Sequence, residues 1–124
     1  MNADSPKSFT SCRTFELWNF EGFHWQILFR SPARKERPFN IDIVFSGVSF
    51  IQVELAFKGL TIRRATEDER KSFTSTRRLF SSEILVQIES QRKCYYVVCG
   101  GFAVYENSLP LSESPLITFR EEDQ

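Results

Sequence analysis

Apolar and polar residues alternate over most of this chain, and this alternation limits its fold more than any other feature. Successive side chains of a β-strand point to opposite faces, so alternation predicts strands with one buried face. The segment 30–38 interrupts the pattern with two prolines and five charges, which predicts a solvated loop. We expect strands at 13–18, 23–29, 41–57 with a break at Ser46-Gly47, 60–62, 83–89, 94–106 and 116–119.

One short helix is expected near residues 66–74. Thr66 and Glu69 have the spacing of a capping box, in which each side chain bonds to the other residue's backbone N–H. Acidic residues fill the first turn and bases follow, which suits the helix dipole. The sequence therefore predicts a mainly-β (α+β) domain. Its form would be an antiparallel β-sandwich or a partly open barrel of about seven short strands with this one helix.

The ends of the chain differ in composition from its middle. We expect a flexible N-terminal segment at 1–11, a single β-rich domain at 12–119 and a charged C-terminal tail at 120–124. Within the domain, Lys58-Gly59 predicts a turn, and Gly100-Gly101 predicts a bulge in a central strand. Phe23, Trp25, Ile27 and Phe29 share one parity and are expected on one buried stripe.

Charge and cysteine usage narrow the classes of protein. Lys and Arg together number 16 and are balanced by 16 Asp and Glu, which argues against a domain that coats nucleic acid. No run is long and apolar enough to span a bilayer, and the first residues lack the apolar stretch of a secretory signal. Three cysteines is an odd number, so we expect reduced, buried thiols in a cytoplasmic protein. A bridge from Cys12 to Cys94 or Cys99 stays open.

The motifs of common active sites are missing from this sequence. His24 is the one histidine, and its place on the polar parity of a strand predicts an exposed or hydrogen-bonded structural role. There is no Gly-x-Ser-x-Gly elbow, no paired Cys/His spacing for zinc and no glycine-rich phosphate loop. We therefore expect neither an enzyme nor a bound cofactor or metal.

Two groups of residues are candidates for an interaction surface. Basic clusters recur between apolar segments, and the densest lies between residues 63 and 78, although loops of any domain carry such charge. Aromatic residues are in excess, with 13 Phe, and a small sheet has difficulty burying all of them. The candidate surface comprises Arg63, Arg64, Arg70, Lys71, Arg77, Arg78, Trp18, Trp25 and Tyr95.

In general texture the chain resembles small β-rich bacterial proteins that lack catalytic residues and act by binding another protein, immunity proteins among them. This resemblance implies a non-enzymatic protein-interaction domain, of immunity or accessory type, that binds a protein partner or a second copy of itself. One alternative is a small barrel or sandwich that binds an apolar or aromatic ligand in an enclosed pocket. Another is RNA binding through a local basic patch at Arg63–Arg78 or Arg92–Tyr96.

Overall fold

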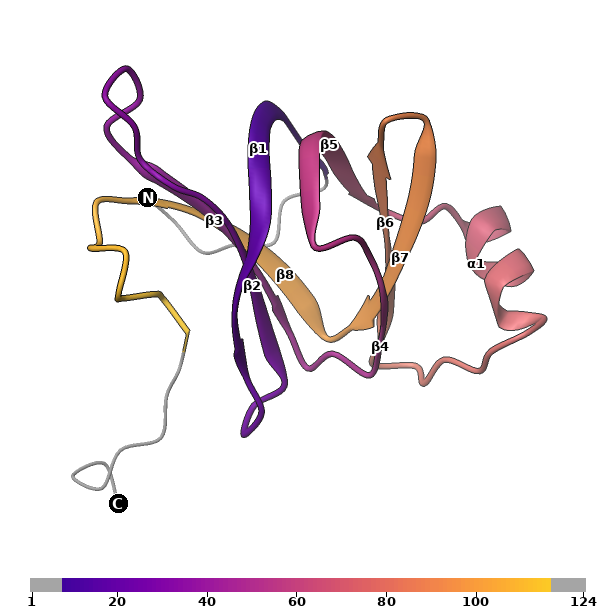
Figure 1. Ribbon diagram of the computed structural model, residues 1–124. Helices are drawn as coiled ribbons and strands as arrows, with labels where there is room; N and C mark the ends of the chain where they lie inside the picture. The colour runs from indigo at the N-terminus through magenta and orange to yellow at the C-terminus, as the bar shows by residue number, and fades with distance from the viewer. Residues whose placement is uncertain (1–7, 117–124) are drawn as a thin grey trace.

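The protein is one antiparallel sheet that curls around its main apolar core, with a second, smaller apolar cluster at Leu28, Val44 and Leu116 (Figure 1). The computed structural model describes residues 8–116. Eight strands and one helix lie within this range, so the predicted mainly-β class with one short helix is confirmed, with one strand more than expected. The elements are β1 Ser8–Glu21, β2 Gln26–Ser31, β3 Asn40–Ser46, β4 Phe50–Gln52, β5 Ala56–Arg64, α1 Glu67–Thr74, β6 Ile84–Ser90, β7 Lys93–Cys99 and β8 Gly101–Asn107.

The strand order explains the curl of the sheet. It runs β4-β7-β6-β5-β1-β2-β3-β8 with antiparallel neighbours throughout. The two end strands do not pair with each other in the described part of the chain, yet β4 continues β3 and β8 continues β7. Gly100 bridges these two bends, because its N–H donates to the Ser46 carbonyl at 2.8 Å. The sheet is therefore the partly open barrel of the two predicted architectures, not a pair of packed sheets.

The core follows the predicted alternation. Ile41, Ile43 and Phe45, which share one parity of β3, all lie in the main apolar cluster. The aromatic side chains of this cluster contact one another, with ring centroids 5.7 Å apart for Phe29 and Phe57. Phe45 and Phe102 stand 6.0 Å apart. These rings fill the interior, so they give no support to a ligand cavity between them.

The helix and the break between β3 and β4 agree with the sequence patterns. The predicted strand at 94–106 is instead two strands, β7 and β8, because the chain bends at Gly100 and β8 leaves β7 to pair with β3 at the end of the sheet. Thr66 Oγ1 accepts from the Glu69 N–H at 3.2 Å, and the Glu69 carboxylate accepts from the Thr66 N–H at 2.8 Å. Gly47, at the break between β3 and β4, has a φ of 65°, which glycine adopts without strain. Figure 1 shows α1 at the outer side of β6 and β7, away from the curled core.

Three boundaries differ from expectation for identifiable reasons. β1 begins at Ser8, inside the segment predicted to be flexible, because Ser8–Ser11 pair with Leu60–Arg63 of β5. Lys58-Gly59 is not a turn but the middle of β5, where Gly59 faces a bulge in β1. The predicted strand at 116–119 falls mostly outside the described residues, as does the tail at 120–124, and Leu116 belongs to no strand.

The hairpin that joins β1 and β2 also differs. β2 begins at Gln26 instead of residue 23, so Phe23 and Trp25 lie in the turn and are exposed instead of buried. At its other end β2 runs to Ser31, and Arg30 is fully buried instead of forming part of a solvated loop. Arg30 can be buried because Asp42 lies opposite it on β3.

Candidate functional site

Within the basic stretch around α1, Arg63 is paired with neighbouring carboxylates. Both terminal nitrogens of Arg63 donate to the Glu69 carboxylate at 2.8 Å, and one also reaches Glu89 at 3.2 Å. The pKa of Arg63 is raised mainly by the hydrogen bonds that it donates to Glu69. The same bond, with the Thr66 N–H, lowers the pKa of Glu69 to about 2. Arg63 thus connects α1 to β5 and β6. Its charge is neutralised by these carboxylates and is little available to a binding partner.

The other bases of this stretch are dispersed. Arg70 donates to the carbonyl of Glu83 at 3.2 Å. The guanidinium of Arg77 stacks on the Phe50 ring, 4.4 Å from its centroid, and donates to the Ser49 carbonyl. Chain-internal contacts therefore occupy three of the six predicted bases. The exposed remainder is Arg64, Lys71 and Arg78.

Two of the three candidate aromatic residues are also engaged within the chain. Trp18 is half-buried, donates from Nε1 to the Leu111 carbonyl at 3.3 Å, and lies 5.4 Å from the guanidinium of Arg30. The ring of Tyr95 packs on Phe57 at 5.1 Å. These residues lie on different elements from Trp25, so the three do not form one surface.

Trp25 belongs to an exposed aromatic cluster at the end of the β1–β2 hairpin. Phe20, Phe23 and Trp25 have exposed fractions of 52%, 69% and 58%, and we call these three residues the aromatic tip. The rings of Phe20 and Trp25 are 6.0 Å apart, so two of the three side chains contact each other. Figure 1 shows this turn projecting beyond the sheet, at the opposite end from the β2–β3 loop.

Glu21 determines the shape of this turn. Its carboxylate accepts from the backbone N–H groups of Phe23 at 2.9 Å and His24 at 2.7 Å, and contacts His24 Nδ1 at 3.0 Å. Burial acts to raise the pKa of Glu21, but these hydrogen bonds outweigh it and lower the pKa. The turn is therefore held by a carboxylate from β1. His24 is hydrogen-bonded, as expected, but it lies in the turn and not on the predicted strand. The sequence signal for this turn was the pair Glu21-Gly22, which directly precedes Phe23.

The backbone at Trp25 is in an unusual conformation. Its φ is 53°, in the left-handed region that bulky residues rarely adopt. The conformation is maintained by a hydrogen bond from the Val48 N–H to the Trp25 carbonyl at 3.1 Å. A large aromatic residue at a position that suits glycine or asparagine costs about 1–2 kcal/mol. Such strain at an exposed side chain points to a function for that side chain.

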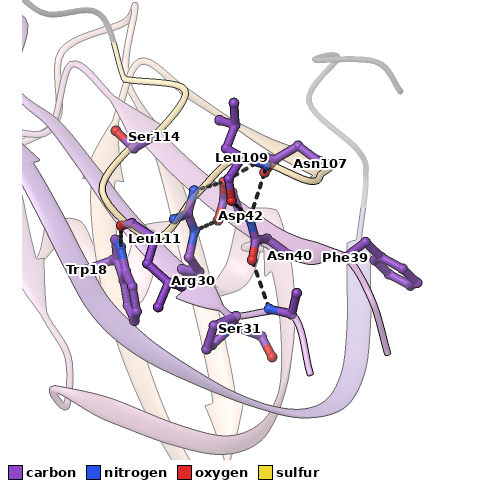
Figure 2. A network of polar contacts seen from close by, with 12 residues as sticks. Trp18, Arg30, Ser31, Phe39, Asn40, Asp42, Asn107, Leu109, Leu111 and Ser114 are labelled. Atoms are coloured by element: carbon purple, nitrogen blue, oxygen red, sulfur yellow. Dashed lines mark hydrogen bonds and ion pairs between the residues drawn. The ribbon is translucent and has the colours of Figure 1, made fainter. Parts of the chain in front are cut away.

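A buried polar network connects the outer side of the sheet to the segment after β8 (Figure 2). Arg30 donates to Asp42 at 2.6 and 2.8 Å, and Asn107 donates to the same carboxylate at 2.8 Å. Asn40 then bonds to Asn107 at 2.9 Å and accepts from the Ala33 N–H at 2.8 Å. Because every link is a hydrogen bond between side chains or to the backbone, the network positions the β2–β3 loop relative to β8.

The cysteine thiols and the potential metal ligands form no further candidate site among the described residues. Cys12, Cys94 and Cys99 are free; Cys99 is buried as expected, whereas Cys12 and Cys94 are exposed, because their strand positions face outward. Among residues 8–116, no three His, Cys, Asp or Glu side chains gather closely enough to hold a metal ion. No helix in that range could cross a membrane.

Comparisons of the chain with protein families, with curated proteins and with solved structures found no match.

Proposed function

We propose that this chain is a non-enzymatic protein-interaction domain that binds its partner through the aromatic tip. The observation that carries the proposal is the joint exposure of Phe20, Phe23 and Trp25 on one projecting turn, with Trp25 in a strained backbone conformation. Aromatic residues dominate the binding energy of protein interfaces. An immunity-type or accessory protein acts in this way, by occupying a site on another protein.

The chemistry of the tip indicates the kind of partner. The tip is convex, so it fits an apolar pocket on the surface of another protein. The segment Glu16–Gln26 carries two carboxylates and neither Lys nor Arg, so a basic rim around that pocket would complement it. A membrane surface fits less well, because interfacial anchors combine aromatic residues with bases that face anionic lipids.

The cysteines suggest the compartment. Two of the three free thiols are exposed, at Cys12 and Cys94. Exposed thiols stay free in a reducing compartment, so we place the domain in the cytoplasm. Reduced thiols at these positions in protein isolated from its native cells are the expected result, and a mixed disulfide at either would contradict it.

The experiment compares capture by three forms of the full chain in a native lysate. The tip variant is Phe23→Ser/Trp25→Asn, and the matched control is Phe80→Ser, because Phe80 is exposed to 67%, close to the 69% of Phe23. We expect one protein to be captured by the wild type and the control and lost with the tip variant. Loss of a central aromatic anchor weakens binding by at least about 30-fold.

Three other results would overturn the proposal. Capture that falls equally with Phe80→Ser would mean general stickiness. A dimer of the purified wild type that disappears in the tip variant, seen by light scattering, would replace the partner with a second copy. Tip-dependent sedimentation with phosphatidylcholine or phosphatidylserine vesicles would replace it with a membrane.

A further inference from the structure

A bulge in β1 turns Arg13 toward the β2–β3 loop. Cys12 and Arg13 together face Gly59 of β5, since the register passes from Ser11↔Leu60 to Thr14↔Lys58. A bulge of two residues against one bends the strand and redirects its side chains. Gly59 permits it with a φ of 77°. The result is a buried arginine beside Ser31 and Phe39, the residues that flank the β2–β3 loop.

Arg13 carries a buried positive charge that forms no ion pair with a carboxylate among residues 8–116. Its Nε donates to Ser31 Oγ at 2.8 Å, and Nη2 donates to the carbonyls of Ser31 at 3.0 Å and Phe39 at 2.9 Å. All of these acceptors are neutral. Nη1 is buried and has no acceptor among residues 8–116. A buried charge without a counter-ion is costly, in contrast to Arg30, which is paired with Asp42.

Two further arginines face the same place. Arg34 and Arg37 form a bridge across a two-residue turn, with N–H···O distances of 2.7 and 3.0 Å in the two directions. Residues directly opposite each other carry their side chains on the same face, where like charges repel. Burial lowers the pKa of Arg13, and the charges of Arg37 and Arg34 lower it further, against the charge of Glu106, which raises it. The guanidinium still stays protonated at neutral pH, so the three positive charges act on one another.

These residues line one pocket. It has a volume of about 280 Å³, and its lining includes the three arginines, Cys12, Thr14 and Glu36. That volume lies at the low end for ligand sites, so it suits a small group and not a nucleotide. Three arginines against one glutamate leave a net charge of plus two among these side chains. A small dianion is the ligand that would balance it.

We propose that this pocket binds a phosphate group, either inorganic phosphate or a small phosphate monoester. Arg34 and Arg37 contact its oxygens, because planar guanidinium groups match phosphate with paired hydrogen bonds. Arg13 lies behind them as a fixed positive charge whose position is set by the bulge. The site is independent of the aromatic tip, because it uses other residues at the other end of the sheet.

The first test is a titration of the full chain with inorganic phosphate, followed by thermal unfolding. A ligand that binds only the folded state raises the unfolding midpoint progressively with its concentration. We expect this rise in the wild type and its loss in Arg34→Gln/Arg37→Gln, whose turn is held by backbone bonds and so keeps its fold. Lys35→Gln/Arg78→Gln removes the same charge outside the pocket lining and should keep the full rise.

Glycerol phosphate identifies the source of the phosphate group. A larger midpoint rise than with inorganic phosphate assigns the site to monoesters, and a smaller one to the free ion. Potassium chloride at equal ionic strength measures the general effect of salt. An equal rise with chloride, or an equal loss in the Lys35→Gln/Arg78→Gln control, would overturn the proposal.

The second test uses the thiol that lines the pocket. Cys12 and Cys94 are both exposed, but only Cys12 lies in the pocket, so Cys94 is an internal control. Cys99 is silent, because burial raises its pKa to about 12. We expect phosphate to slow alkylation of Cys12 by iodoacetamide, with the same half-saturation as the midpoint rise, and to leave Cys94 unchanged. Equal rates at Cys12 with and without phosphate would contradict the proposed site.

Discussion

Arg30 and Asp42 lie directly opposite each other on β2 and β3, and both side chains are completely buried. Their ion pair is bidentate, at 2.6 and 2.8 Å, and Asn107 adds a third hydrogen bond to the carboxylate. The pair lies under the segment that follows β8, where Trp18 covers the guanidinium (Figure 2). It therefore joins the middle strands of the sheet to the end of the described chain.

Removing one partner of this ion pair should strongly destabilise the fold. Asp42→Asn keeps the shape of the side chain but leaves Arg30 buried without a counter-ion, so we expect a loss of about 3–5 kcal/mol in the free energy of unfolding. Urea denaturation measures this loss. Arg30→Met/Asp42→Leu removes both charges and should be clearly less destabilising than Asp42→Asn. A double variant as unstable as the sum of its single variants would contradict this view of the pair.

Replacing Trp25 should separate binding from stability. Trp25→Asn removes a bulky side chain from a left-handed backbone position, where Asn is tolerated. The lost contact with Phe20 offsets part of that gain, so the free energy of unfolding should change by less than about 1 kcal/mol. Capture of the partner should nevertheless fall. Urea denaturation and the lysate capture, performed on the same preparation, check both statements, and a large loss of stability would assign Trp25 a structural role instead.

Acid should weaken the attachment of α1. The pKa of Glu69 is lowered from 4.5 to about 2 in the folded protein, chiefly by its hydrogen bond with Arg63. A lowered carboxyl pKa stabilises the fold fully above about pH 4.5, and this contribution is lost as the pH falls toward 2. Glu69→Gln should therefore lower stability at neutral pH and show a smaller further loss between pH 4.5 and 2. Thermal unfolding across that range measures it.

Glu67→Gln is the matched control for this titration. Glu67 lies in the same first turn of α1 but is exposed, and it has no role in the capping box. Its removal costs only the weak interaction with the helix dipole, about 0.3–1 kcal/mol. An acid response of Glu67→Gln that matches that of Glu69→Gln would show that general charge, and not the pairing with Arg63, controls the stability.

The bulge in β1 should depend on the left-handed backbone conformation of Gly59, the residue opposite it. A Cβ added at Gly59 would meet the Ser11 carbonyl oxygen at 3.6 Å, which is ordinary contact, so space is not the obstacle. The obstacle is the φ of 77°, which a residue with a Cβ adopts only with strain. Gly59→Ala should therefore lower the free energy of unfolding by about 1–2 kcal/mol. Gly59→Asn should cost less, because Asn tolerates this region. If urea denaturation finds Gly59→Asn less stable than Gly59→Ala, the backbone conformation at residue 59 is not the cause of the loss.

Much of the fold could be predicted because its determinants are local. Alternation located the core residues of β3, and the spacing of Thr66 and Glu69 located α1. Gly47 marked the break between β3 and β4. Each of these signals lies within a few residues of its effect. Arg30 shows the opposite case, because a charged residue two positions before Pro32 indicates a loop until its partner Asp42, twelve positions along the chain, is known.

The candidate sites were less predictable. Trp25 was identified as a surface candidate, although its parity had indicated burial, and three of the six basic residues chosen near α1 proved to be engaged with neighbours. The pocket at Arg13 combines a bulge in β1 with a turn about twenty residues further on, and no local pattern connects them.

The sequence by itself determined that most of the chain forms strands, where the helix begins and which residues of β3 face the core, since these follow from side-chain periodicity and from hydrogen bonds between near neighbours. The tertiary structure alone decided which charges are neutralised and which aromatic rings remain in water. Electrostatic compensation and burial depend on groups that strand pairing brings together from distant positions. For that reason Arg30 is an ion-paired core residue, whereas Arg13, equally basic in the sequence, is buried against neutral acceptors.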